Sequence, residues 1–166
     1  MLSTAVRTSA ALGLRMATPL LPLTRHTPFG LQQAILEPVL DRLLASPLAA
    51  GELDMLHGRW LQLRVTDLGL TWCVSRDRQG IRVAQHQTAD VCIAGKWRDF
   101  LLLASRQEDP DTLFFRRRLQ LSGDVELGLA VKNLLDSLDP EELPPRVWQG
   151  VQALGLAVQG IDKTGS

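Results

Sequence analysis

The residues best suited to metal binding or nucleophilic chemistry are few and widely separated. The histidines are His26, His57 and His86, and the cysteines are Cys73 and Cys92. No histidine lies near another histidine or a cysteine at metal-ligand spacing, so we predict no zinc site. Neither cysteine belongs to a CxxC motif or has a basic neighbour that would favour the thiolate. We interpret the histidines as surface residues and the cysteines as buried apolar side chains of a reduced, cytosolic protein.

Other catalytic motifs are equally sparse. No GxSxG sequence marks a hydrolase of that kind, and GDVELG at 123–128 lacks the Gly-Lys-Ser/Thr of a phosphate-binding loop. Glu108, Asp109 and Asp111 could attract a cation, but helix capping explains them better. A hydrolase or transferase that uses Ser122 or Cys73 is the weakest hypothesis, because neither has a base at recognisable spacing. We therefore predict no enzyme activity, no metal and no cofactor.

The charges are balanced over the chain and uneven along it. Lys and Arg total 18, as do Asp and Glu, in a chain of 166 residues. This balance argues against a protein that coats nucleic acid. The densest basic run, residues 116–118, could contact a lipid headgroup or an acidic patch on a partner. Three arginines fall short of the usual 4–8 cluster, so a solvated helix end with favourable dipole interactions is the simpler interpretation.

Residues 1–28 differ in composition from the rest. The first acidic residue is Glu37, and Arg7, Arg15 and Arg25 precede it among apolar and small residues. Three interpretations remain open for this segment: a loosely packed terminal helix, contact with a membrane surface, or a transit peptide. We expect one domain from residue 29 to residue 166.

The apolar periodicity predicts the elements of that domain. A period near 3.6 predicts a helix over 30–46, which Pro38 bends and Pro47 ends. A period of two then predicts strands at 60–65, 70–75, 81–84 and 90–93, joined by turns at 67–69 and 77–80, as an antiparallel meander. A helix is expected over 96–105, and a second begins at residue 110, after Asp109 as its N-cap. A third helix begins at residue 124. A fourth begins at residue 139 and must restart at Pro144 and Pro145. A fifth strand is expected at 119–121. Strands followed by helices indicate an α+β domain.

Two stretches of sequence resemble a known family. The first is LHGRWL at 56–61 with DLGLTW at 67–72. The second is ASRQEDPDTLFFRRRL at 104–119, followed by SGDVELGL at 122–129 and VKNL at 131–134. Together they resemble the bacterial sterol-carrier-protein-2 domain proteins that are accessory factors of ubiquinone biosynthesis. The resemblance covers about residues 29–140.

The resemblance implies a five-stranded, mostly antiparallel sheet covered by helices around an apolar tunnel. It also implies a non-catalytic role in oxygen-independent (anaerobic) ubiquinone synthesis, with isoprenoid quinone precursors as ligands and the iron–sulfur proteins UbiU and UbiV as partners. Such a protein would be cytoplasmic and peripheral at the inner membrane. The apolar periodicity supplies the expected lipid-binding residues, which are Leu63, Val65, Trp72, Val74, Leu113, Phe114, Phe115, Leu127, Val131, Leu134, Leu135, Val151 and Leu154.

Periodicity does not separate a lined cavity from an ordinary solid core. The alternative function is therefore a protein–protein adaptor with a solid core and no ligand, acting through residues 116–118 or the terminal helices.

Overall fold

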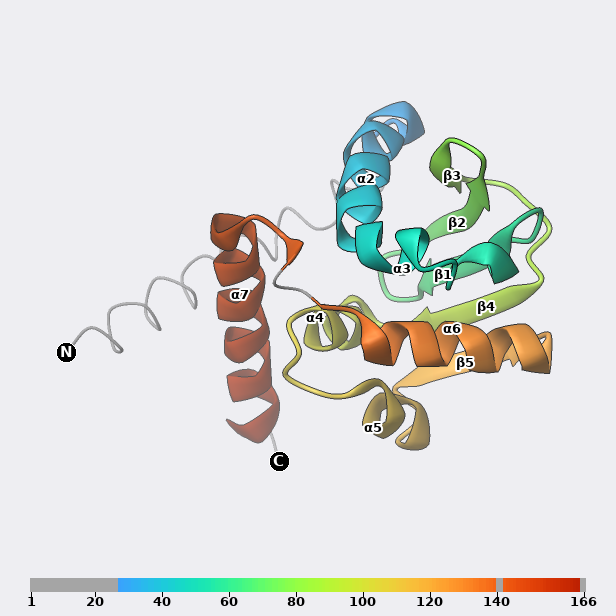
Figure 1. Ribbon diagram of the computed structural model, residues 1–166. Coiled ribbons are helices and arrows are strands. Elements are labelled where there is room, and N and C mark those ends of the chain that lie inside the picture. Colours follow the sequence, from blue (N-terminus) through green and yellow to red (C-terminus); the bar gives the residue numbers. More distant parts are fainter. Residues whose placement is uncertain (1–26, 140–141, 165–166) are drawn as a thin grey trace.

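The fold is α+β, as the sequence predicts (Figure 1). The computed structural model describes residues 27–139 and 142–164, so most of the basic segment expected at 1–28 lies outside the described residues. The elements in chain order are α2 (Phe29–Leu43), α3 (Ala45–Ala49), the short 3-10 helix η2 (Asp54–Leu56), β1 (Leu61–Val65), β2 (Leu70–Asp77), β3 (Gly80–Ala84), β4 (Val91–Gly95), α4 (Trp97–Ala104), α5 (Pro110–Phe115), β5 (Leu119–Gly123), α6 (Val125–Ser137) and α7 (Pro145–Thr164).

The five strands form one sheet in the order β3-β2-β1-β4-β5. The pairs β1–β2, β2–β3 and β4–β5 are antiparallel, whereas β1–β4 is parallel. The predicted simple meander is therefore wrong at one step, because β4 joins β1 and not β3. Asp90 explains this placement: its N–H donates to the Trp60 carbonyl at 2.9 Å, and its carboxylate accepts from the Trp60 N–H at 2.8 Å. These bonds fix the start of β4 beside the start of β1.

The sheet has one apolar face, and the main core lies on it. Leu61 of β1 is opposite Val74 of β2 and Val91 of β4, and all three side chains are buried. Residues of α2, α5 and α6 join the same core cluster. Because alternate side chains of a strand point to opposite faces, Gln62 and Arg64 lie on the other, more polar face. This division between a buried and a wetter face confirms the prediction from the period of two.

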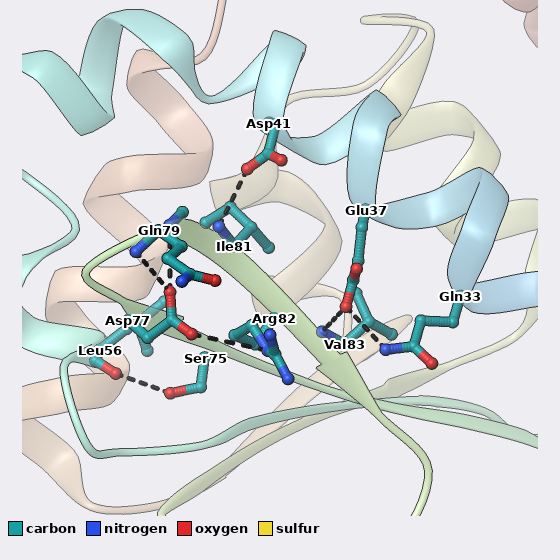
Figure 2. A network of polar contacts seen from close by, with 11 residues as sticks. Gln33, Glu37, Asp41, Leu56, Ser75, Asp77, Gln79, Ile81, Arg82 and Val83 are labelled. Carbon is teal, nitrogen blue, oxygen red and sulfur yellow. Dashed lines mark hydrogen bonds and ion pairs between the residues drawn. The ribbon is translucent and has the colours of Figure 1, made fainter. Parts of the chain in front are cut away.

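Helix α2 closes one edge of the sheet. Strand β3 is an edge strand, and its outward N–H groups need partners other than a neighbouring strand. The Glu37 carboxylate accepts from the Val83 N–H at 2.9 Å, and the Asp41 carboxylate accepts from the Ile81 N–H at 2.9 Å. Figure 2 shows both carboxylates reaching from the helix to the strand, with Gln33 donating to Glu37. Two helix side chains thus replace the missing strand.

The predicted Asp109 N-cap and the helix restart at Pro145 are confirmed, and one predicted proline stop is wrong. Asp109 caps α5 with Pro110 in the first turn, and Asp124 caps α6. Pro38 lies inside α2 without ending it. Pro47 does not stop the helix either. The break comes earlier, at Leu44, and Pro47 lies buried in the first turn of α3, where its missing N–H costs no helical hydrogen bond.

Helix α7 packs against α4 and not against the sheet. Leu102 and Val158 are fully buried between the two helices, and they form a second, smaller cluster. Gly155 lets the helices approach closely, because a Cβ at this position would collide with the Ser105 side chain. The C-terminal helix therefore forms a layer of its own, separate from the main core.

Candidate lipid-binding interior

The apolar interior between the sheet and the helices contains most of the predicted lipid-binding residues. Val74, Leu113, Leu127, Val131 and Leu134 are buried members of the main core cluster. Leu63, Trp72, Phe114 and Leu135 are half-buried and pack against that cluster. Val65 is 5% exposed and lies on the same sheet face by register. Ten of the thirteen predicted residues therefore line or fill one apolar region; these ten are Leu63, Val65, Trp72, Val74, Leu113, Phe114, Leu127, Val131, Leu134 and Leu135.

Trp72 is the predicted lining residue whose own side chain carries a polar group. Its indole N–H donates to the Gln32 side-chain oxygen of α2 at 2.7 Å. A buried Trp usually finds such a partner, because an unpaired N–H in an apolar site is costly. The contact ties α2 to β2 and leaves the ring's apolar body beside the core.

Three predicted residues lie elsewhere. Phe115 is 90% exposed at the end of α5, so it does not line the interior. Leu154 packs against the second cluster, between α4 and α7. Val151 lies half-buried on α7, which contacts α4. Sequence periodicity selected Val151 and Leu154 as lipid-binding residues because it shows which face of a helix is apolar without showing what that face meets.

The sequence analysis missed part of the interior. Leu53 and Leu56 are 0% and 1% exposed in the connection between α3 and β1. Ile93 and Leu119 are also fully buried. The apolar pattern places both in strands, but they are absent from the predicted lipid-binding residues. The connection escaped prediction because a three-residue helix is too short to show a period. Its two leucines, three residues apart, were the available signal.

Over residues 27–139 and 142–164, the reactive side chains do not come together as a catalytic group. His57 and His86 are exposed, and His26 lies outside the described residues. Burial raises the pKa of the Cys92 thiol. Within the described ranges, no three His, Cys, Asp or Glu side chains come together as metal ligands. Cys73 and Cys92 both flank Gln62 across β1, about 10 Å apart at two strand spacings, which is too far for a disulfide.

The acidic cluster of the sequence is divided among three structural roles. Asp109 caps α5, Asp111 pairs with Lys132 of α6, and Glu108 lies 3.6 Å from Arg118. Ser122 lies exposed on β5. These placements explain the acids without a bound cation.

Two hollows occur on the polar side of the molecule. One of about 650 Å³ has Gln62, Thr71 and His86 in its wall. The other, of about 430 Å³, lies where β4 meets β5 and α4 begins. Their walls are mainly polar and charged, so they are distinct from the apolar interior. The described helices include none long and apolar enough to cross a membrane.

Comparison with known proteins agrees with this architecture. Residues 37–136 match the SCP-2 sterol transfer family. The ubiquinone biosynthesis accessory factor UbiT of Escherichia coli K12 is 46% identical over 138 residues, which are 83% of this chain and 79% of that protein. UbiT of Escherichia coli O157:H7 matches equally well.

A solved structure shares the fold. The UbiJ-SCP2 ubiquinone synthesis protein aligns with a TM-score of 0.54 and 22% identity, over 66% of this chain and 97% of that one. The family match spans the sheet, α4, α5 and nearly all of α6, the elements that enclose the apolar interior. This chain therefore belongs to the SCP-2 sterol transfer family, as a close relative of the UbiT accessory factors.

Proposed function

We propose that this protein is a non-catalytic lipid-binding accessory factor of oxygen-independent (anaerobic) ubiquinone biosynthesis. It binds isoprenoid quinone precursors and presents them to the ring-hydroxylating iron–sulfur partners UbiU and UbiV. The lipid-binding unit is residues 29–166, which act in the cytoplasm and at the inner membrane surface. The observation that carries the proposal is 46% identity to UbiT over 83% of the chain.

The apolar interior supports this proposal. Residues of β1, β2, α5 and α6 converge there, and the reactive side chains described above stay outside it. Proteins hold lipids in concave, mostly apolar sites with few polar groups. We propose that Leu63, Trp72 and Phe114, which are half-buried at the margin of the core, contact the ligand first.

The free energy of moving a lipid tail between water, protein and bilayer suits a lipid carrier. Burying about 20 methylenes at ~0.8 kcal/mol each gives roughly 16 kcal/mol against water. The same contribution nearly cancels against a bilayer, because both environments are apolar. A loaded protein would therefore exchange its ligand with a membrane or an apolar partner site and not with water.

The direct test is lipid extraction from gently purified protein, followed by mass spectrometry. We expect an isoprenoid quinone precursor at near-stoichiometric amount. Repeated recovery of stable protein without any lipid would contradict the proposal. Val125→Ala is a suitable matched variant, because its side chain is 85% exposed outside the interior and its lipid content should equal the wild-type value.

The second candidate is a protein–protein adaptor with a solid core, and the burial of Val131 favours it. This side chain is only 1% exposed. In a solid core, Val131→Trp would lower the free energy of unfolding by ~1–3 kcal/mol through overpacking. If the interior accepts lipid, the ring takes the ligand's space, and lipid content falls while stability holds. Leu129→Trp on the exposed side of α6, where Leu129 is 56% exposed, is the control and should change neither quantity.

A further inference from the structure

Cationic side chains from two separate segments meet at one end of the sheet. Gly95, the last residue of β4, pairs with Leu119, the first residue of β5. Lys96 follows Gly95 directly, and Arg118 precedes Leu119. The 430 Å³ hollow lies at this junction, and its wall contains Lys96, Arg98, Arg117 and Arg118 together with one acidic residue, Asp99.

Arg118 forms ion pairs with two carboxylates at this junction. Its guanidinium donates to the Asp99 carboxylate at 2.6 Å and lies 3.6 Å from Glu108. The Asp99 side chain is 5% exposed, so this ion pair is anchored from within the protein. The two carboxylates offset the charge of Arg118. Lys96 is exposed, and the half-buried Arg98 lies over the Trp97 ring at 5.8 Å.

The turn between α5 and β5 carries an exposed aromatic ring that precedes Arg116 and Arg117 in the sequence. Phe115 is 90% exposed, more than any other large apolar residue of the described chain. Arg116 and Arg117 follow it, and both are exposed. Arg117 has φ of 58°, a left-handed conformation that non-glycine residues rarely adopt.

We propose that this surface docks the protein on bilayers that contain anionic phospholipid. The basic-turn surface consists of Lys96, Arg98, Phe115, Arg116 and Arg117. The hollow receives lipid phosphate groups, and Phe115 enters the boundary between headgroups and acyl chains. This inference rests on the proposed action at the inner membrane surface and names the residues that make the contact, which lie outside the apolar interior and require no quinone precursor there.

Charge and chemistry identify the bilayer as the occupant. The four basic residues of this surface, Lys96, Arg98, Arg116 and Arg117, reach the lower end of the 4–8 that suffice for attraction to anionic lipid surfaces. A fully exposed phenylalanine matches the apolar side chains that enter membrane interfaces. A soluble phosphate would use the cations and leave the exposed ring unused.

The test is sedimentation of the full-length protein with vesicles. We expect binding to vesicles of phosphatidylglycerol and phosphatidylcholine, little binding to phosphatidylcholine alone, and loss of binding in about 1 M salt, where charges are screened beyond ~3 Å. The double variant Arg116→Gln with Arg117→Gly should bind roughly 25-fold more weakly, about fivefold for each lost charge. Phe115→Ala should bind roughly tenfold more weakly.

Matched variants separate docking from folding. Arg117→Gly places glycine where φ is already positive, so its melting temperature should not fall. Val125→Ala removes another apolar side chain, which is 85% exposed. Because Asp124 and Glu126 flank it in the sequence, an anionic surface would not attract this position, and the substitution should not affect vesicle binding. Arg78→Gln removes an exposed arginine in the distant β2–β3 turn and should reduce binding less than either docking substitution.

Three results would overturn the inference. They are equal binding to neutral and anionic vesicles, unchanged binding of the basic-turn variants, and tight binding of inorganic phosphate without vesicle binding. Lipid extraction decides the proposed function separately. Protein that carries a quinone precursor and ignores vesicles would refute the docking surface alone.

Discussion

At the residue scale, two aspartates begin helices beside the interior and carry charge that responds to pH. The Thr112 hydroxyl and the Thr112 N–H both donate to Asp109 and lower its pKa. The Leu127 N–H, at 2.7 Å, and then Arg59 lower the pKa of Asp124. Each carboxylate is therefore stabilised in its ionised form by folding.

The sign of the pH dependence follows from these lowered pKa values. The ordinary carboxyl value is 3.8, and each folded pKa lies below it. The stabilisation is fully present above 3.8 and is lost as the pH falls through the folded pKa. Asp109→Asn with Asp124→Asn keeps a capping oxygen without the charge.

We expect wild type to be more stable than this double variant at about pH 6, with the difference shrinking at about pH 3. Denaturant unfolding at both pH values measures this difference in the free energy of unfolding. Asp136→Asn, at the exposed end of α6, is the control and should show no comparable change. A difference that is constant over this range would show that these carboxylates contribute no charge-dependent stability.

At the element scale, the closure of β3 by α2 depends on two carboxylates. Glu37→Ala with Asp41→Ala leaves the Val83 and Ile81 N–H groups without their partners, at a cost of about 1.5 kcal/mol for each bond. We expect faster hydrogen exchange at these two amides and a lower free energy of unfolding.

The conservative pair Glu37→Gln and Asp41→Asn retains an acceptor oxygen at each position and should protect both amides better than the alanine pair. Equal exchange rates in the wild type and the alanine variant would mean that α2 does not seal this edge.

The α4–α7 contact is the second test at this scale. Gly155→Ala adds a methyl group that collides with the Ser105 side chain, so we expect a loss of ~1–3 kcal/mol in unfolding free energy. Gly150 lies in the same helix with open space around its Cα. Gly150→Ala should therefore stabilise α7 by up to about 1 kcal/mol through helix propensity.

Thermal unfolding compares these variants. The double variant Ser105→Gly with Gly155→Ala should recover part of the lost stability, because it removes the colliding atoms. Equal melting temperatures for Gly155→Ala and Gly150→Ala would contradict the close approach of α4 and α7.

At the scale of the whole molecule, size limits how much of a polyprenyl tail the interior can shelter. A domain of about 130 residues has a radius of gyration near 14 Å and a diameter of roughly 36 Å. An isoprene unit spans about 5 Å. An extended tail longer than about seven units must therefore fold back or leave the domain.

We expect affinity for quinone precursors to rise with tail length and then level off at or below about seven isoprene units. Competition binding with a series of tail lengths measures this limit. A tail-independent affinity would place recognition at the headgroup, and continued strengthening well beyond seven units would require a second subunit.

Prediction from sequence succeeded where the information is local. The period of two in residues 61–65 and 70–75 predicted strands with one buried face, and Asp109 and Asp124 predicted two helix starts. Motif resemblance added the family. The predicted helix stop at Pro47 was wrong, because the helix breaks earlier, at Leu44. Periodicity also selected Phe115, Val151 and Leu154, which lie outside the main core, because it identifies an apolar face without identifying its neighbour.

The sequence by itself determined the elements, their caps and the absence of an evident catalytic motif, because these depend on residues a few positions apart. Only the tertiary structure decided that β4 pairs in parallel with β1, that Glu37 and Asp41 close the edge of β3, and that Lys96 and Arg98 lie in one hollow with Arg117 and Arg118. Each of these contacts joins residues about twenty or more positions apart. Their meeting depends on how the strands pair and how the helices pack across the sheet, which no local pattern records.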